Sequence, residues 1–219
     1  MKGWKLPLGL MILSGSLVLS LTGCKKGPND PFISLKSRDG RIKGTWKLTK
    51  VEYNRRTVIT DPDEQCSPRI SATAITSDDG TNFTRYDTIT RFDLVNNTCV
   101  VEGQSTPFTG SFEFTVNKDG TYSFTSGAGT SRIEGEGYWF WSDSKKNKLF
   151  VSFDRSVPSC SLNGFDEDNA SNIIFGQWMV ERLASKELVL YVKCHSVITE
   201  GNRTTELTTI VRLTFEKQK

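Results

Sequence analysis

The sequence predicts an all-β fold, a single antiparallel meander of about 8–9 strands that closes on itself. Three observations predict this class. Apolar and polar residues alternate in short runs, polar or Gly-containing turns separate these runs, and no segment keeps a sustained helical period. We expect the meander to close because a closed sheet has no exposed edge strands.

The first strand signal runs from Ile42 to Tyr53, with Trp46 and Leu48 on one parity. Residues 83–95 form a further predicted strand with weaker alternation. The clearest hairpin follows, because a turn sequence at 117–120 separates two apolar faces. Those faces consist of Phe112, Phe114 and Val116 before the turn, and of Tyr122 and Phe124 after it.

The second half of the chain continues the pattern. Polar turns at 142–147, 184–186 and 200–203 separate runs that are rich in β-branched and aromatic residues. The strands predicted between these turns are 133–141, 149–153, 174–183, 187–195 and 204–215.

Two long polar segments, Arg55–Asn82 and Asp154–Asn172, interrupt this ladder. Loops of such length in a compact domain are usually functional lids or disordered segments. If the closed meander binds a ligand, the first of them is the expected gate of its mouth.

Residues 1–23 are predicted to be an export signal. Lys2 and Lys5 precede an apolar stretch from Leu6 to Leu21, whose 16 residues are short for a membrane-spanning helix. The alternative is an N-terminal membrane helix. The sequence Leu21-Thr22-Gly23-Cys24 resembles the lipobox of bacterial lipoproteins, and this favours the signal.

The lipobox resemblance implies that the chain is cut before Cys24 and that lipid is attached to this cysteine. In that family a further acyl chain, such as palmitate, is added to the new N-terminus, and several chains together make dissociation rare. Residues 24–40 are then a lipidated tether, and 41–219 are the domain. The expected location is the bacterial cell envelope. The resemblance to Gram-negative lipoproteins implies the outer membrane, because their sorting pattern favours it where Lys25, in place of Asp, follows the cysteine.

The charge balance gives no support to nucleic-acid binding. Removing residues 1–23 takes away two lysines and no acidic residue, so the formal charge falls from +3 to +1.

After Cys24, an even number of cysteines remains in a compartment where disulfides persist: Cys66, Cys99, Cys160 and Cys194. Four buried thiols are the alternative, and the spacing does not suit a metal site. Of the three connectivities, we favour Cys66–Cys99 and Cys160–Cys194, because each closes a loop within one half of the chain.

The residues for catalysis are few, and we predict neither an enzyme nor a cofactor. His195 is the only histidine, and it follows Cys194 on a predicted strand, which points the two side chains to opposite faces. No catalytic residues and no metal ligands are assigned. Asp166-Glu167-Asp168-Asn169 is interpreted as a solvated loop, with calcium binding as the alternative.

Gly44-Thr45-Trp46 opens the first strand, as the Gly-x-Trp element does in lipocalins. Residues 41–217 are also similar to the lipocalin-like domains of lipoproteins from the Bacteroidetes group. In lipocalins an Arg from the last strand covers the Trp of the first strand, so the resemblance implies this role for Arg212 or Arg182. Phrases typical of these domains are 118–122 (KDGTY), 137–141 (GYWFW) and 183–188 (LASKEL).

Two functions follow from this reading. The first is a lipocalin-like barrel that binds a small apolar or amphipathic ligand, with Trp139 and Trp178 in the wall of its pocket. The alternative is a structural or protein-interaction module with a solid barrel, whose protein partner the sequence does not name.

Overall fold

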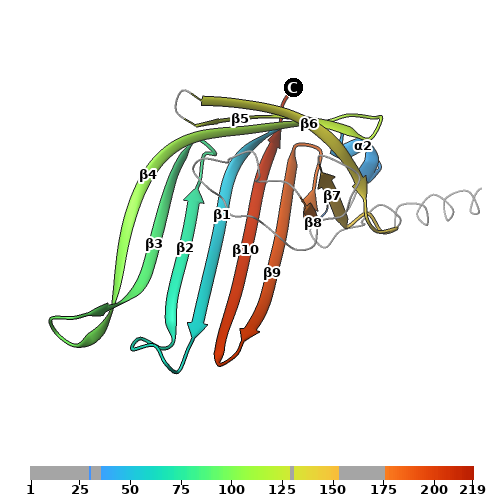
Figure 1. Cartoon of the computed structure of the whole chain (residues 1–219). Coiled ribbons are helices and arrows are strands. Elements are labelled where there is room, and N and C mark those ends of the chain that lie inside the picture. Colours follow the sequence, from blue (N-terminus) through green and yellow to red (C-terminus); the bar gives the residue numbers. More distant parts are fainter. Residues whose placement is uncertain (1–29, 31–35, 129–130, 153–175) are drawn as a thin grey trace, which may run out of the picture.

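The computed structural model describes Asp30 and residues 36–128, 131–152 and 176–219. These residues form one antiparallel sheet of ten strands that closes into a ring, together with one short helix (Figure 1). The predicted all-β class is therefore confirmed. Among the described helices, none has the length and apolar character that a membrane span requires.

The helix α2 spans Arg38–Ile42 and precedes all the strands. The first five strands are β1 (Gly44–Thr60), β2 (Arg69–Ser77), β3 (Asn82–Asp93), β4 (Thr98–Val116) and β5 (Thr121–Ala128). The others are β6 (Ser131–Trp141), β7 (Lys148–Ser152), β8 (Gly176–Leu183), β9 (Glu187–Glu200) and β10 (Arg203–Lys217).

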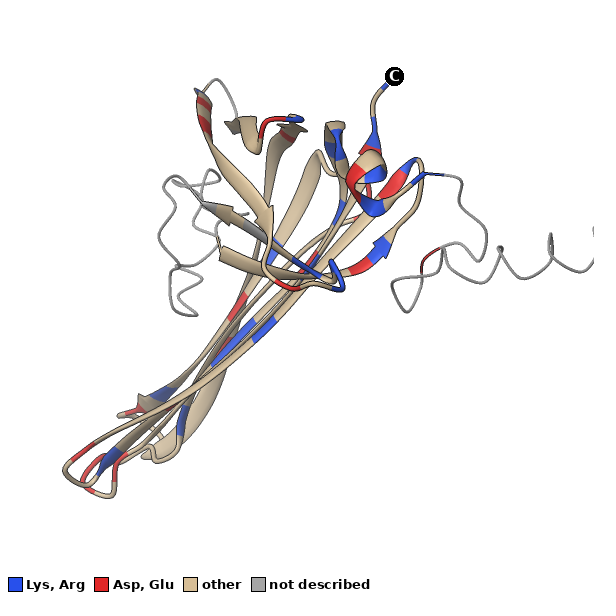
Figure 2. Ribbon diagram, turned by 90° about the vertical axis from the view of Figure 1, so that its right-hand side faces the viewer, with Lys and Arg blue, Asp and Glu red and all other residues tan. Residues whose placement is uncertain are grey.

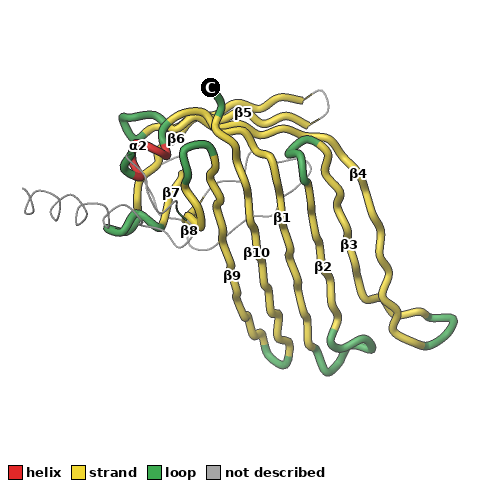
Figure 3. The backbone as a smooth tube through the Cα atoms, turned by 180° about the vertical axis from the view of Figure 1, so that it is seen from behind, coloured by secondary structure: helices red, strands yellow, loops and turns green. Residues whose placement is uncertain are grey.

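The sheet has two parts because β1 changes one of its neighbours along its length. At its start, Gly44–Lys47 pairs with Glu113–Val116 of β4, which closes a ring through β5, β6, β7, β8, β9 and β10. From Val51 onward the same edge of β1 pairs with β2 instead. Beyond the ring the sheet continues as six strands in the order β9, β10, β1, β2, β3 and β4, which we call the wing (Figures 1 and 3).

The hydrophobic core lies inside the ring. Alternate residues of its strands point inward, and the aromatic ones pack against one another, as Phe114 does edge-on against Phe215 at a centroid distance of 5.0 Å. Fully buried aromatic residues include Trp46, Trp178, Tyr122 and Phe112. These are the strands whose alternation of apolar and polar residues is visible in the sequence.

One end of the ring is covered by α2 and by Asp30. The carboxylate of Asp30, which is fully buried, accepts hydrogen bonds from Arg38 and Arg41 and from the backbone N–H of Leu183. Arg41 also donates to the Leu183 carbonyl, at 2.6 Å. These contacts attach Asp30 and residues 36–40, which the sequence analysis assigned to the tether, to the folded domain.

The prediction that Arg55–Asn82 is a loop is wrong. Strand β1 continues to Thr60, and Arg69–Ser77 forms β2 between β1 and β3. The sequence of β2 shows no alternation of apolar and polar residues, because most of this strand is half-exposed on both faces. The other long segment, Asp154–Asn172, lies outside the described residues.

Candidate functional site

The wing is a single layer of sheet. Figure 2 shows it edge-on, extending from the ring as one thin layer. Among the described residues, 98–109 of β4 and 192–200 of β9 pair with a neighbouring strand on one side only. Alternate residues of each strand point to opposite faces of the wing. The inner face carries the residues that are in register with the core residues Tyr53 and Val211. The outer face carries the alternating residues, such as Asn54 and Ile210.

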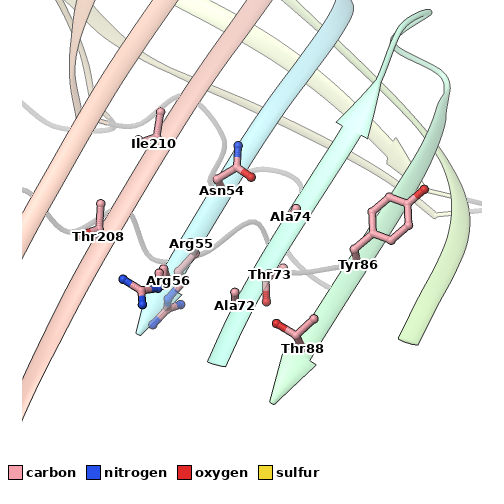
Figure 4. Close-up of a pocket in the computed structure, with 10 residues that line it drawn as sticks. All are labelled: Asn54, Arg55, Arg56, Ala72, Thr73, Ala74, Tyr86, Thr88, Thr208 and Ile210. Carbon is pink, nitrogen blue, oxygen red and sulfur yellow. The ribbon is translucent and has the colours of Figure 1, made fainter. Parts of the chain in front are cut away.

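The outer face contains a groove of about 410 Å3 (Figure 4). Its floor is Ala72 and Ala74 of β2, whose small side chains leave space between larger neighbours. Arg56 of β1 lies on one side of these alanines, and Tyr86 of β3 lies on the other. The remaining lining residues are Asn54, Arg55, Thr73, Thr88, Thr208 and Ile210.

The groove is open and mostly uncharged. Tyr86 is 49% exposed although it is aromatic, and Val101 and Val197 on the same face of the wing are 71% and 56% exposed. Exposed Tyr and Arg side chains, such as Tyr86 and Arg56 here, are enriched at protein interfaces, whose centres are depleted in Lys, Asp and Glu. The groove can therefore receive a side chain of a second molecule.

The inner face of the wing is more polar. Asp87 accepts hydrogen bonds from Thr73 Oγ1 at 2.6 Å and from Arg85 Nε at 2.7 Å. Arg91 pairs with Glu102 at 3.2 Å. A second depression of about 360 Å3 lies among these residues. The two faces thus offer different chemistry on the two sides of one sheet.

The free end of the wing is held by the predicted disulfide between Cys66 and Cys99. It joins the turn between β1 and β2 to the start of β4, and the strands β2 and β3 lie between the two cysteines in sequence. Cys194 is also disulfide-bonded, whereas Cys160, its predicted partner, lies outside the described residues, as does Cys24.

Trp139 and Trp178, the predicted ligand-binding residues, are buried in the core of the ring, with exposures of 8% and 1%. Trp139 donates from Nε1 to the Asn117 carbonyl, and its ring lies edge-on to Trp141 at 6.1 Å. The groove on the wing is formed by different residues. No sequence pattern indicated it, because Ala72 and Ala74 lie in a segment predicted to be a loop.

The predicted cover of Trp46 is not an arginine. The Nζ atom of Lys217 lies 4.9 Å from the centre of the Trp46 ring and donates to the Arg41 carbonyl. Arg212 pairs with Glu181 and Glu52 instead. The reason is strand parity: Lys217 continues the inward series of Leu213 and Phe215 on β10, and Arg212 points outward.

Two polar atoms in the ring lack hydrogen-bond partners among the described residues. They are the hydroxyl groups of Tyr122 and Ser126, both on the inward parity of β5 and both buried. Burial raises the pKa of Tyr122 well above its usual value. Such atoms commonly bind a buried water molecule or a polar group of a ligand.

His195 is half-exposed on the outer face, with Nδ1 3.2 Å from Thr208 Oγ1 and 3.8 Å from a carboxylate oxygen of Glu206. Its neighbour Cys194 has the inner parity, as predicted. Among the described residues, no group of three or more His, Cys, Asp or Glu side chains is placed to hold a metal ion. The acidic residues 166–168 lie outside this part of the chain.

Comparison of the chain with known protein families, with curated proteins and with solved structures found no match. The interpretation of the site therefore depends on its own geometry.

Proposed function

We propose that this protein is a lipoprotein of the bacterial cell envelope that binds a partner protein on the outer face of its wing. The lipid on Cys24 would hold it on a membrane, expected to be the outer membrane, and the ring would serve as a lipocalin-like barrel that supports the wing. The observation that carries the proposal is the groove over Ala72 and Ala74 in the middle of an exposed single-layer sheet.

The size of the wing suits such a partner. Six strands about 4.8 Å apart, each contributing roughly nine residues at about 3.3 Å, give a face of roughly 850 Å2. A stable protein–protein interface covers about 800 Å2 on each partner. The partner would insert an apolar or aromatic side chain into the groove, where Tyr86 and Arg56 are placed as its contacts.

The experiment uses the alternation of the strands. A photo-crosslinking residue is placed at Thr88 or Ser105 on the outer face, and at Ile89 or Gln104 on the inner face as matched controls, since all four are exposed. In cells that make the protein, the two outer positions should give the same discrete adduct, and the inner positions should not.

A second pair of variants tests whether the crosslinked partner binds in the groove. Ala72→Arg fills the groove and should remove the adduct, whereas Ser71→Arg, one residue away on the other face, should leave it. Equal adducts from both faces, or an adduct that survives Ala72→Arg, would contradict the proposal.

A second candidate function is ligand carriage inside the ring, which the unpaired hydroxyl groups of Tyr122 and Ser126 favour. A small amphipathic ligand could supply the missing hydrogen-bond partners there. An apolar, environment-sensitive dye should then bind one-to-one to the folded protein, and Tyr122→Phe should weaken this binding. Dye that binds only to the unfolding protein would exclude this candidate.

A further inference from the structure

The end of the ring that α2 covers is strongly basic. We call this end the cap, and it consists of Asp30 and residues 36–43, 117–120, 142–148, 184–186 and 217–219. The cap carries eleven Lys or Arg residues and four Asp or Glu residues, a net charge of +7, in a chain whose total is +3. The rest of the chain therefore carries a net charge of −4.

Contacts between these segments place them at one end of the molecule. Arg38 donates to Asn147 at 2.9 Å, and the backbone N–H of Lys217 donates to the Lys186 carbonyl. Trp141 donates to Asp39, and its neighbour Trp139 bonds to the 117–120 turn. The cap is thus one continuous surface built from Asp30 and five separate segments of the sequence.

The opposite end of the molecule is acidic. The three turns at the free end of the wing, residues 60–68, 93–98 and 200–203, contain five acidic residues and one Arg (Figure 2). The five are Asp61, Asp63, Glu64, Asp93 and Glu200. The molecule therefore has an electrostatic polarity along the length of the wing.

The positive charge of the cap faces solvent. Asp30 offsets Arg38 and Arg41 inside the protein, and Lys146 pairs with Asp39. The lysines on the three turns of the cap, by contrast, are exposed: Lys118, Lys145, Lys148 and Lys186. These flexible side chains can reach a negatively charged surface without any change in the fold.

The cap also lies close to the predicted lipid. Cys24 precedes Asp30 by six residues, which span at most about 21 Å when fully extended. Because Asp30 is buried in the cap, a membrane that holds the lipid of Cys24 lies within that reach. This short connection lets the cap approach the membrane to within the Debye length of about 8–10 Å, where anionic headgroups attract its lysines.

We propose that the cap docks on a lipid surface that contains anionic headgroups, and that this contact points the acidic end of the wing away from the membrane. The inference rests on the proposed lipid anchor. The same lysines could attract a nucleic acid, but the short connection to Cys24 favours the lipid surface.

The experiment uses the full chain, purified from membranes and reconstituted into vesicles of phosphatidylcholine alone or with roughly one third phosphatidylglycerol. A membrane-impermeant amine reagent then labels the lysines, and mass spectrometry measures the rate at each. At low salt, the four turn lysines should react at least about threefold more slowly on the anionic vesicles, and the difference should disappear near 0.5 M salt, where screening is nearly complete. Lys193 on the wing is the internal control, because it is exposed and should react equally on both vesicles.

Charge reversal tests the surface directly. The triple variant Lys145→Glu, Lys148→Glu and Lys186→Glu should lose the protection of Lys118 on anionic vesicles, whereas Lys193→Glu should keep it. Equal labelling on both kinds of vesicle, slow labelling of Lys193 together with the cap, or protection of the cap by duplex DNA as strong as that by anionic vesicles would overturn the proposal. Flotation with neutral vesicles reports the anchor alone: a chain that floats but shows no protection retains its anchor and lacks the docking surface.

Discussion

Asp79 holds the turn between β2 and β3 through one carboxylate. Its oxygens accept hydrogen bonds from the backbone N–H groups of Asn82 and Thr81, both at 2.8 Å, and from the side chains of Asn82 and Ser77. The backbone N–H of Asn82 is the largest cause of the lowered pKa of Asp79, followed by the Asn82 side chain and the Thr81 N–H.

A lowered pKa in the folded state means that the ionised carboxylate stabilises the fold. This contribution is complete above the pKa of an unfolded Asp, about 3.9, and is lost as the pH falls below it. Asp79→Asn should therefore lower the melting temperature at pH 7, and the difference from the parent protein should shrink below about pH 4. Thermal unfolding at several pH values measures this, and a difference that is constant down to pH 2 would contradict it.

Gly80, the next residue, has φ +67°, and an added Cβ would lie 2.0 Å from the carbonyl oxygen of Leu48. Gly80→Ala should therefore destabilise the protein by about 2–3 kcal/mol, from strain and from the displaced backbone of β1. Gly201→Ala is the matched control, because Gly201 has φ +61° and nothing within 4 Å of the added atom. It should cost only about 1 kcal/mol in urea unfolding, and equal losses would show that close contact with Leu48 is unimportant.

At the scale of the elements, the disulfide between Cys66 and Cys99 connects the ends of two hairpins. It closes a segment with a sequence separation of 33 residues, and cross-linking a loop of this length stabilises a fold by about 3–4 kcal/mol through the unfolded chain. The double variant Cys66→Ser and Cys99→Ser should lose this amount in denaturant unfolding. Amide exchange should accelerate mainly in the wing turns, and equal acceleration throughout the ring would contradict this local role.

The elements also show what the sequence can predict. The hairpin of β4 and β5 was recognised because Phe112, Phe114 and Phe124 face the buried core, and burial on one face produces the alternation. Strand β2 was not recognised because both of its faces lie in the wing. The groove was missed for the same reason, since a depression over two alanines depends on which strands become neighbours.

The alternation of side chains along β10 explains why a different residue from the predicted one covers Trp46. The resemblance to lipocalins predicted the correct strand for the cover of Trp46, the last one, but the wrong residue. The choice between Lys217 and Arg212 depends on the register of β1 and β10, which pairs Trp46 with Lys217. A sequence without its strand partners does not contain that information.

At the scale of the whole molecule, Trp178 distinguishes a ring that binds a ligand from a solid ring that only supports the wing. Trp178 is 1% exposed and belongs to the core, so Trp178→Ala should cost about 3–5 kcal/mol of stability. If the ring holds a ligand against this side chain, the variant should instead lose dye binding with a smaller loss of stability. Chemical denaturation and dye titration on the same samples distinguish the two outcomes.

The pairing of β1 with β10 has a consequence for the order in which the protein folds. The first and last of the described strands are neighbours along most of their length, from Trp46 with Lys217 to Thr60 with Thr204. A chain that crosses a membrane from its N-terminus therefore cannot complete its sheet until the last residues have emerged. Contacts this distant in sequence make folding slow. Until β10 is available, the backbone groups of β1 that pair with it remain without their partners. If the chain is exported as proposed, a chaperone that holds these strands during export should raise the yield of folded protein.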